Sequence, residues 1–230
     1  MHAHRMTVEN VFLEVGMDYR VLRELFESCL GANYRHTENM GSFSSVRDGD
    51  VLYLFFEKSD GLEDWVNNLS YRAVPYGRKG DEWYCHEGFL RVWREILPYL
   101  EELLSSPSVR RVITVGYSHG AAVALLCHEY VWFTRPDIAD ACETYGFGCP
   151  RVVYGTVPHE GERWRSFYLV RNVDDAITHL PPRFLGYRHV GRLIEIGESG
   201  KYSGIDAHRS ENYIAELKNA ELRIAEKGNR

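Results

Sequence analysis

The sequence predicts an α/β protein with a mostly parallel central sheet flanked by helices. Residues 111–118, "RVITVGYS", read as a short buried strand that passes directly into a helix-forming segment at 119–133. Two more short apolar segments, at 141–147 and 166–171, then read as strands. Because strands joined through a helix usually pair in parallel, this order favours a parallel sheet.

The chain length favours one domain. A chain of 230 residues can bury one substantial core. We expect residues 1–230 to form a single domain, with residues 1–40 as a helical N-terminal extension and residues 211–230 as a peripheral C-terminal helix.

The other predicted elements surround this centre. Residues 18–31 read as a helix that ends at Gly31, and residues 88–104 as a long helix that Pro98 kinks or unwinds. Residues 57–84 show no clean periodicity. The remaining expectations are strands at 42–46 and 51–56 around an Asp48-Gly49 turn, a late strand or hairpin at 184–197, and a terminal helix at 211–227.

Composition excludes several function classes. A net charge of -6 argues against a basic nucleic-acid-binding surface, and Arg163 and Arg165 read as parts of solvated faces. The five cysteines form no CxxC pair and are odd in number, so we expect buried, reduced thiols and no zinc site. The sequence indicates no metal and no cofactor.

The sequence also yields an expectation about location. The first twenty residues contain no continuous apolar segment, and the apolar run "VLYLFF" is too short to span a bilayer. We therefore expect no secretory signal, no transmembrane segment and a cytoplasmic protein, with export by another route left open.

Residues Gly116-Tyr117-Ser118-His119-Gly120 fit the G-x-S-x-G pattern. In this motif a strand turns sharply into a helix, so the serine Oγ is exposed above the sheet edge and the helix N-terminus faces a developing oxyanion. The pentapeptide alone is weak support for catalysis. The strand before it and the alanine-rich helix after it supply the context that the motif requires.

A nucleophilic serine needs a histidine base and an orienting carboxylate. His119 is unsuitable as the base because it is adjacent to Ser118 in sequence, and we expect it to line the pocket. The histidines that lie usefully downstream are His128, His159, His179, His189 and His208.

Several segments together resemble the class 3 (fungal-type) lipase family. "GYSHGAAVA" is similar to the family's GHSLGGALA, "TYGFGCPRV" to its TFGxPRVG, "CHEGF" to VHxGF and "RNVDDAITHLPP" to NxxDxVPxLPP. These motifs occur in the right order between about residues 51 and 213. The resemblance implies an α/β-hydrolase fold and a serine hydrolase that cleaves carboxylic esters of the lipid or acylglycerol type.

The resemblance also implies the triad partners of Ser118. The family's acid falls on Asp175, with Asp174 as a loop residue or strand-end cap. The family's histidine falls on His208, and His179 and His189 are weaker alternatives. For the oxyanion hole, the resemblance implies the backbone N–H of His119 together with Ser59.

Two departures and one ambiguous segment follow β-strand residue Phe56. Glu57 and Lys58 replace the family's arginine and glycine, which puts the geometry of the oxyanion loop in doubt. The next segment resembles the lid-bearing region but equally fits a helix packed on the core. The candidate lid or acyl-pocket residues are Trp65, Val66, Leu69 and Tyr117.

Other functions remain open at this point. A short-chain or feruloyl-type carboxylesterase or a phospholipase would use the same triad. A lipase-like binding scaffold with weak catalysis is the alternative from another class. In each enzymatic case the partner is an ester or lipid small molecule, with a possible transient lipid interface.

Overall fold

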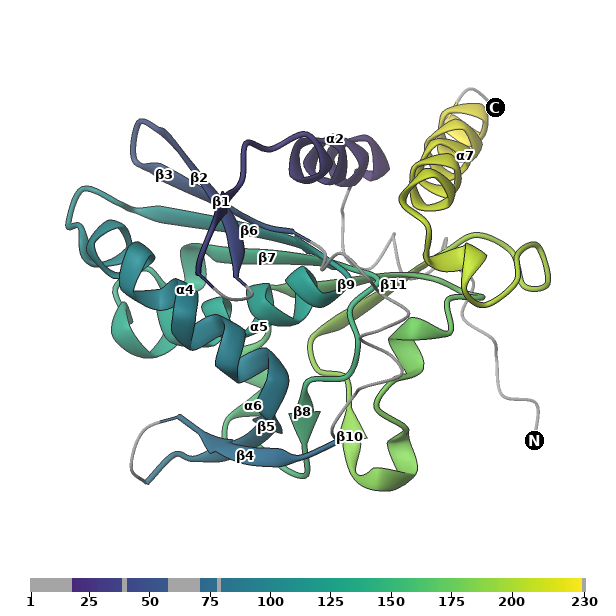
Figure 1. The fold of residues 1–230 in the computed structure, drawn as a ribbon. Helices are drawn as coiled ribbons and strands as arrows, with labels where there is room; N and C mark the ends of the chain where they lie inside the picture. The colour runs from purple at the N-terminus through teal and green to yellow at the C-terminus, as the bar shows by residue number, and fades with distance from the viewer. Residues whose placement is uncertain (1–17, 39–40, 58–70, 78–79, 229–230) are drawn as a thin grey trace.

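A mostly parallel sheet forms the centre of the molecule, as the sequence predicts (Figure 1). The computed structural model describes residues 18–38, 41–57, 71–77 and 80–228. Parallel pairing joins β3 to β6, β6 to β7, β7 to β9 and β9 to β11, and β2 and β1 extend the sheet in antiparallel pairing. In sheet order, the strands are β1 (Arg35–His36), β2 (Ser42–Asp48), β3 (Val51–Phe56), β6 (Arg111–Tyr117), β7 (Cys142–Phe147), β9 (Phe167–Asn172) and β11 (Arg192–Ile196).

Helices cover both faces of this sheet (Figure 1). One face carries α4 and α5, and the other carries α2 and α7. The helices are α2 (Tyr19–Leu30), α4 (Glu87–Ser105), α5 (His119–Thr134), α6 (Glu160–Arg163) and α7 (Ser210–Gly228). Single turns of 3-10 helix occur at η1 (Ala139–Ala141), η2 (Ile177–His179), η3 (Arg183–Leu185) and η4 (Asp206–His208).

The alternation of side chains along β6 divides the core into two layers. Val112 packs with the cluster under α4 and α5, whereas Ile113, Val115 and Tyr117 pack with the cluster under α2 and α7. The helix α5 is apolar and buried on nearly all sides, as expected of a helix enclosed between a sheet and its neighbours. This enclosure fixes the start of α5 firmly against the end of β6.

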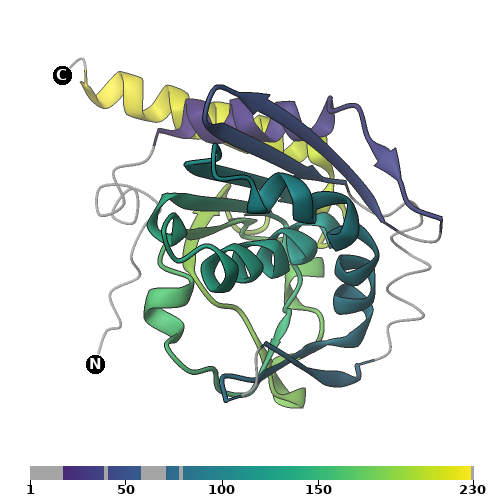
Figure 2. The ribbon, with the colours of Figure 1, turned by 90° about the vertical axis from the view of Figure 1, so that its left-hand side faces the viewer.

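The terminal helices pack against each other on their shared face (Figure 2). Arg23 of α2 pairs with Glu221 of α7 at 3.0 Å. Tyr213 and Leu217 of α7 are fully buried in the same cluster as Phe26 of α2. The first half of α7 therefore contributes to the core cluster between the central sheet and the helices α2 and α7.

A second, four-stranded antiparallel sheet lies below α4 in Figure 1. Its strands, in order, are β10 (Tyr187–Arg188), β8 (Val153–Tyr154), β5 (Trp83–His86) and β4 (Ala73–Tyr76). The sequence pattern does not predict β4 and β5, because short strands that contain Pro75 and alternate irregularly resemble a loop. The predicted late hairpin is divided: β10 joins this small sheet, and β11 joins the central one.

Two further expectations are corrected. The helix α4 continues through Pro98 without unwinding, and the alternative of a kink at Pro98 stays a prediction. Arg163 is not on a solvated face: its side chain is 0% exposed and pairs with the equally buried Glu129 at 2.8 Å. Arg165 does lie on the surface, paired with Asp140.

The described part of the chain contains no helix long and apolar enough to cross a membrane.

Candidate active site

Ser118 occupies a strained turn between β6 and α5. Its backbone lies at φ 57° and ψ −122°, a conformation that residues with a side chain rarely adopt. A Cβ at position 116 would lie 2.3 Å from the carbonyl oxygen of Gly120, and a Cβ at position 120 would lie 2.2 Å from that of Phe56. Both glycines are therefore required for the close approach of the backbones, as the G-x-S-x-G pattern predicts.

Three side chains from different elements form one hydrogen-bonded chain. The Nε2 atom of His208, on η4, lies 2.8 Å from the Oγ of Ser118. The Nδ1 atom of the same ring lies 2.7 Å from Oδ2 of Asp175, in the loop after β9. All three residues are buried. The structure thus brings together the three residues that the sequence singles out as nucleophile, base and acid.

The carboxylate of Asp175 has two further hydrogen-bond donors. The hydroxyl of Tyr213 donates to Oδ2 at 2.6 Å, and the backbone N–H of Ile177 donates to Oδ1 at 2.9 Å. Burial and the neighbouring Asp175 raise the pKa of Tyr213 well above its usual value, so this phenol stays a donor. With Nδ1–H directed to the carboxylate, Nε2 is left to accept the serine proton.

The ring of His208 is held from behind. The ring of Tyr117 stacks on it with centroids 5.4 Å apart, and the hydroxyl of Tyr117 donates to the carbonyl of His208. The amide of Asn172 donates to the carbonyl of Ala207 at 3.3 Å. On another side, Gly148 leaves room for the ring, because a Cβ there would lie 2.9 Å from Cε1 of His208. Tyr117, expected at a lid or acyl pocket, is thus buried in the core behind the histidine.

The alternative acid and bases lie apart from Ser118. Asp174 accepts hydrogen bonds from the backbone N–H groups of residues 200, 201 and 202, which matches its interpretation as a loop cap. His189 binds the carbonyl of Thr178 at 2.8 Å, and burial lowers its pKa to about 3. His179 is exposed beside Arg151.

His119 begins α5 directly after the serine. Its ring is buried against Phe89, and burial lowers its pKa to about 4, so it is neutral at pH 7. The first N–H groups of an α-helix have no partner within the helix, which suits the backbone of this turn to an anionic oxygen. The other predicted oxyanion and lid residues, Ser59, Trp65, Val66 and Leu69, and also Lys58, lie outside the described residues.

Tyr213, Asn172 and Gly148 are the contacts that sequence reasoning did not foresee. The signal for Tyr213 was its position five residues after His208, in the first turn of α7. Asn172 ends β9 and Gly148 directly follows β7, and only the assembled sheet brings them to the histidine.

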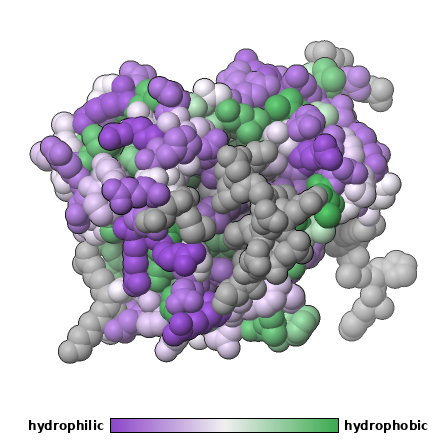
Figure 3. All heavy atoms as spheres, viewed as in Figure 1, coloured by the Kyte–Doolittle hydropathy of each residue, from purple (hydrophilic) through white to green (hydrophobic). Residues whose placement is uncertain are grey.

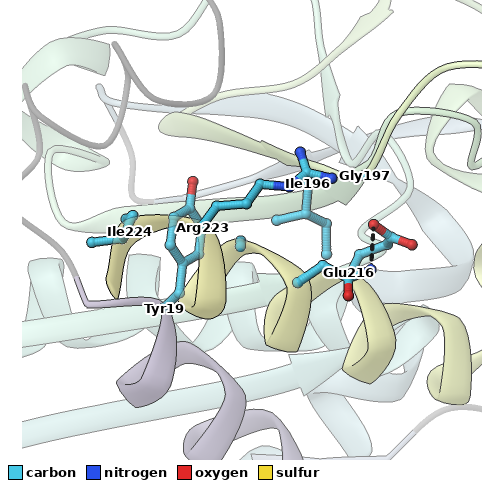
Figure 4. Close-up of a pocket in the computed structure, with 8 residues that line it drawn as sticks. Tyr19, Ile196, Gly197, Glu216, Arg223 and Ile224 are labelled. Atoms are coloured by element: carbon cyan, nitrogen blue, oxygen red, sulfur yellow. Dashed lines mark hydrogen bonds between the residues drawn. The ribbon is translucent and has the colours of Figure 1, made fainter. Parts of the chain in front are cut away.

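A small hollow lies behind this site, between α2, α7 and the end of β11 (Figure 4). Its lining residues are Tyr19, Ile196, Gly197, Glu216, Asn219, Ala220, Arg223 and Ile224. Glu216 holds the loop that precedes η4, because its carboxylate binds Lys201 at 2.5 Å and the hydroxyl of Tyr202 at 2.8 Å. The hollow therefore borders the support of His208 and does not reach Ser118.

Comparison with known protein families identifies the family of this chain. The family described as lipase (class 3) matches residues 53–185, more than half of the chain. The chain belongs to the class 3 lipase family. The family resemblance noted in the sequence is thereby confirmed.

Curated relatives of this class 3 lipase family member come from fungi. A lipase of Rhizomucor miehei is 28% identical over 61% of this chain and 40% of its own length. The secreted mono- and diacylglycerol lipase 1 of Fusarium solani is 28% identical over 57% of this chain and 39% of its own length. The matched regions thus span only about two-fifths of these relatives.

Solved structures establish the α/β-hydrolase fold. A lipase from Rhizopus microsporus var. chinensis superposes with a TM-score of 0.62 at 18% identity, covering 94% of this chain and 85% of its own. The triacylglyceride lipase of Rhizomucor miehei superposes with a TM-score of 0.60 at 20% identity, covering 78% and 81%. The predicted fold class is confirmed.

The expected cytoplasmic location is wrong. The Fusarium solani relative and its counterparts in Malassezia globosa and Malassezia restricta are named secreted lipases. The expectation depended on the lack of an apolar segment in the first twenty residues, and such a lack does not define where a protein resides.

Proposed function

We propose that this class 3 lipase family member hydrolyses carboxylic esters of the acylglycerol type through a Ser118–His208–Asp175 triad. The observation that carries the proposal is the continuous pair of hydrogen bonds from Asp175 through His208 to a serine on a strained turn. The names of the relatives, which include mono- and diacylglycerol lipases, support this substrate class.

The reaction proceeds through a covalent acyl-enzyme. The Oγ of Ser118 bonds to the ester carbonyl carbon while its proton passes to Nε2 of His208. The carbonyl oxygen becomes an oxyanion, which the backbone N–H of His119 stabilises, with Ser59 as the proposed second donor. The C–O ester bond then breaks, and the proton on Nε2 passes to the departing alkoxide.

Hydrolysis of the acyl-enzyme repeats these steps with water. His208 takes a proton from the water, the hydroxide oxygen bonds to the acyl carbon, and the Ser118 oxygen leaves with that proton. Asp175 stays ionised and stabilises the imidazolium in both halves of the reaction. Each step needs only groups of this chain, the ester and water.

The test is turnover of p-nitrophenyl esters from acetate to palmitate by wild type and by Ser118→Ala, with fluorophosphonate labelling in parallel. We expect a loss of at least 1000-fold in kcat and a loss of labelling in the variant. Ser105→Ala, at an exposed serine of α4, is the matched control and should behave as wild type. A folded wild-type protein with neither turnover nor labelling would favour the binding scaffold, and a short-chain optimum would favour a carboxylesterase.

A further inference from the structure

An exposed apolar tip lies at the edge of the small sheet. Phe184 of η3 is 86% exposed, more than any other large apolar side chain in the described part of the chain, and its neighbour Leu185 is also exposed. Figure 3 shows hydrophobic surface at the lower edge of the molecule, where β10 lies in Figure 1. An aromatic side chain that extends into water on a short turn contributes nothing to the core.

Two exposed tyrosines continue this surface across the small sheet. Tyr154 of β8 lies against the turn, because a Cβ at Gly186 would come within 2.7 Å of its ring. Tyr84 of β5 follows, with its ring centroid 6.5 Å from that of Tyr154. Phe184, Leu185, Tyr154 and Tyr84 are called the apolar edge below.

Two arginines lie beside the apolar edge. Arg183 is exposed next to Phe184, and within the described residues it has no carboxylate partner. Arg151 donates to the carbonyl of Pro181 at 2.9 Å, at the base of the same turn. Arg171 is paired with Glu195 at 2.7 Å, so within the described residues Arg183 and Arg151 are the two cations of this region without a carboxylate partner.

This combination favours an anionic lipid surface as the partner. Exposed aliphatic and aromatic side chains enter the boundary between headgroups and acyl chains, tyrosines prefer the same depth, and arginines attract anionic headgroups. A chain with a net charge of -6 would otherwise be repelled by such a surface. The positive charges of Arg183 and Arg151 beside the apolar tip oppose that repulsion where contact occurs.

A series of ring contacts joins the apolar edge to the catalytic turn. Tyr154 contacts Tyr187 at 5.3 Å between centroids, and Tyr187 contacts His86 at 5.9 Å. The ring of His86 lies 4.4 Å from that of Phe89, which packs on His119. In addition, η3 belongs to the same connection as Asp175, between β9 and β10.

We propose that the apolar edge, together with Arg183, docks this protein on an anionic lipid surface and holds the Ser118 site beside it. The inference deepens the proposed function and rests on it, because docking serves catalysis only if the substrate is a lipid ester.

The test measures co-sedimentation of the Ser118→Ala protein with phosphatidylcholine vesicles that contain or lack phosphatidylglycerol, so that no lipid is hydrolysed during binding. Phe184→Ser should weaken binding to anionic vesicles about tenfold. Arg183→Gln should weaken it about fivefold and leave binding to neutral vesicles unchanged. The matched controls are Leu222→Ser, at a 63% exposed leucine of α7, and Arg110→Gln, at an exposed arginine remote from η3.

The outcomes separate the two proposals. The second measurement uses proteins in which Ser118 is intact. Docking is supported if Phe184→Ser loses turnover of emulsified esters but keeps turnover of soluble p-nitrophenyl acetate. Equal vesicle binding by Phe184→Ser and Leu222→Ser overturns docking and leaves the triad intact. A wild-type dimer that Phe184→Ser converts to a monomer, without vesicle binding, also overturns it and makes the edge an interface between copies. If the soluble ester is not turned over in a Ser118-dependent way, the proposed function is wrong, whereas the vesicle-binding result is unaffected.

Discussion

Two of the buried groups of ionisable side chains, Asp175 with His208 and Glu129 with Arg163, differ in what lies at their ends. Asp175 and His208 form a linear chain whose last member is a serine on a strained turn. Glu129 and Arg163 form a closed pair at 2.8 Å, to which Trp83 donates at 3.0 Å and Asp81 adds a carboxylate at 2.5 Å.

The two groups also differ in how well their atoms are satisfied. Both carboxylate oxygens of Asp175 accept hydrogen bonds. In the described part of the chain, Oε2 of Glu129 and Nε of Arg163 have no hydrogen-bond partner, and Trp132 lies 4.8 Å from the guanidinium. Burial of charge therefore does not by itself mark an active site. A serine at the end of the chain, on strained backbone, is the additional feature on which the proposed site depends.

The largest expected difference between the two groups concerns turnover. Asp175→Asn should lower kcat about 1000- to 10,000-fold with little loss of stability, because the amide no longer fixes the histidine tautomer. The measurement is turnover of p-nitrophenyl butyrate together with thermal unfolding. Asp174→Asn, which affects only the cap of residues 200–202, is the control, and an equal loss there would contradict the assignment of Asp175.

The closed pair should affect stability and not chemistry. Arg163→Met leaves Glu129 buried without its partner and should lower the free energy of unfolding by about 3–5 kcal/mol. The double variant Arg163→Met/Glu129→Met should recover much of this loss. Denaturant unfolding measures both, and kcat of the folded fraction should stay near that of wild type. An undiminished stability of the single variant would show that the pair is not needed.

Glu129 should make the free energy of unfolding depend on pH. Burial raises its pKa to about 7, although Arg163 opposes the shift. The folded protein then binds more protons than the unfolded chain between about pH 4.5 and 7, so this group lowers the stability as the pH rises through that window. Relative to Glu129→Gln, wild type should lose about 2–3 kcal/mol across it. Parallel curves for the two proteins would contradict this assignment.

The smallest expected effect concerns a donor to the acid. Tyr213→Phe removes the hydroxyl that donates to Asp175 at 2.6 Å and keeps the buried ring. Since Asp175 retains two other donors, kcat should fall about tenfold with KM unchanged, as expected for one hydrogen bond to a charged group. Steady-state kinetics on a soluble ester measures it. A change in KM alone would place Tyr213 outside the support of the acid.

The two groups also show which features could be predicted from the sequence and which could not. The turn at Ser118 was predictable because its requirements are local: two glycines, a strand before and a helix after. Asp175 and His208 were predictable through the order of family motifs. Arg163 was not, because its partner Glu129 is 34 positions away on the buried helix α5, and an isolated arginine in a polar segment resembles a surface residue. The short strands β4 and β5 were missed because their pairing partners, not their patterning, define them.

The backbone of the catalytic turn has a consequence for how this segment would vary under selection. Glycine at 116 and 120 is required by atoms of the main chain, so a library screened only for folded protein would keep both. At 118 the same screen would favour glycine over serine, because φ 57° costs a residue with a side chain and costs glycine little. A screen for turnover would restore serine. Two selections applied to one five-residue turn would therefore separate what the fold demands from what the chemistry demands.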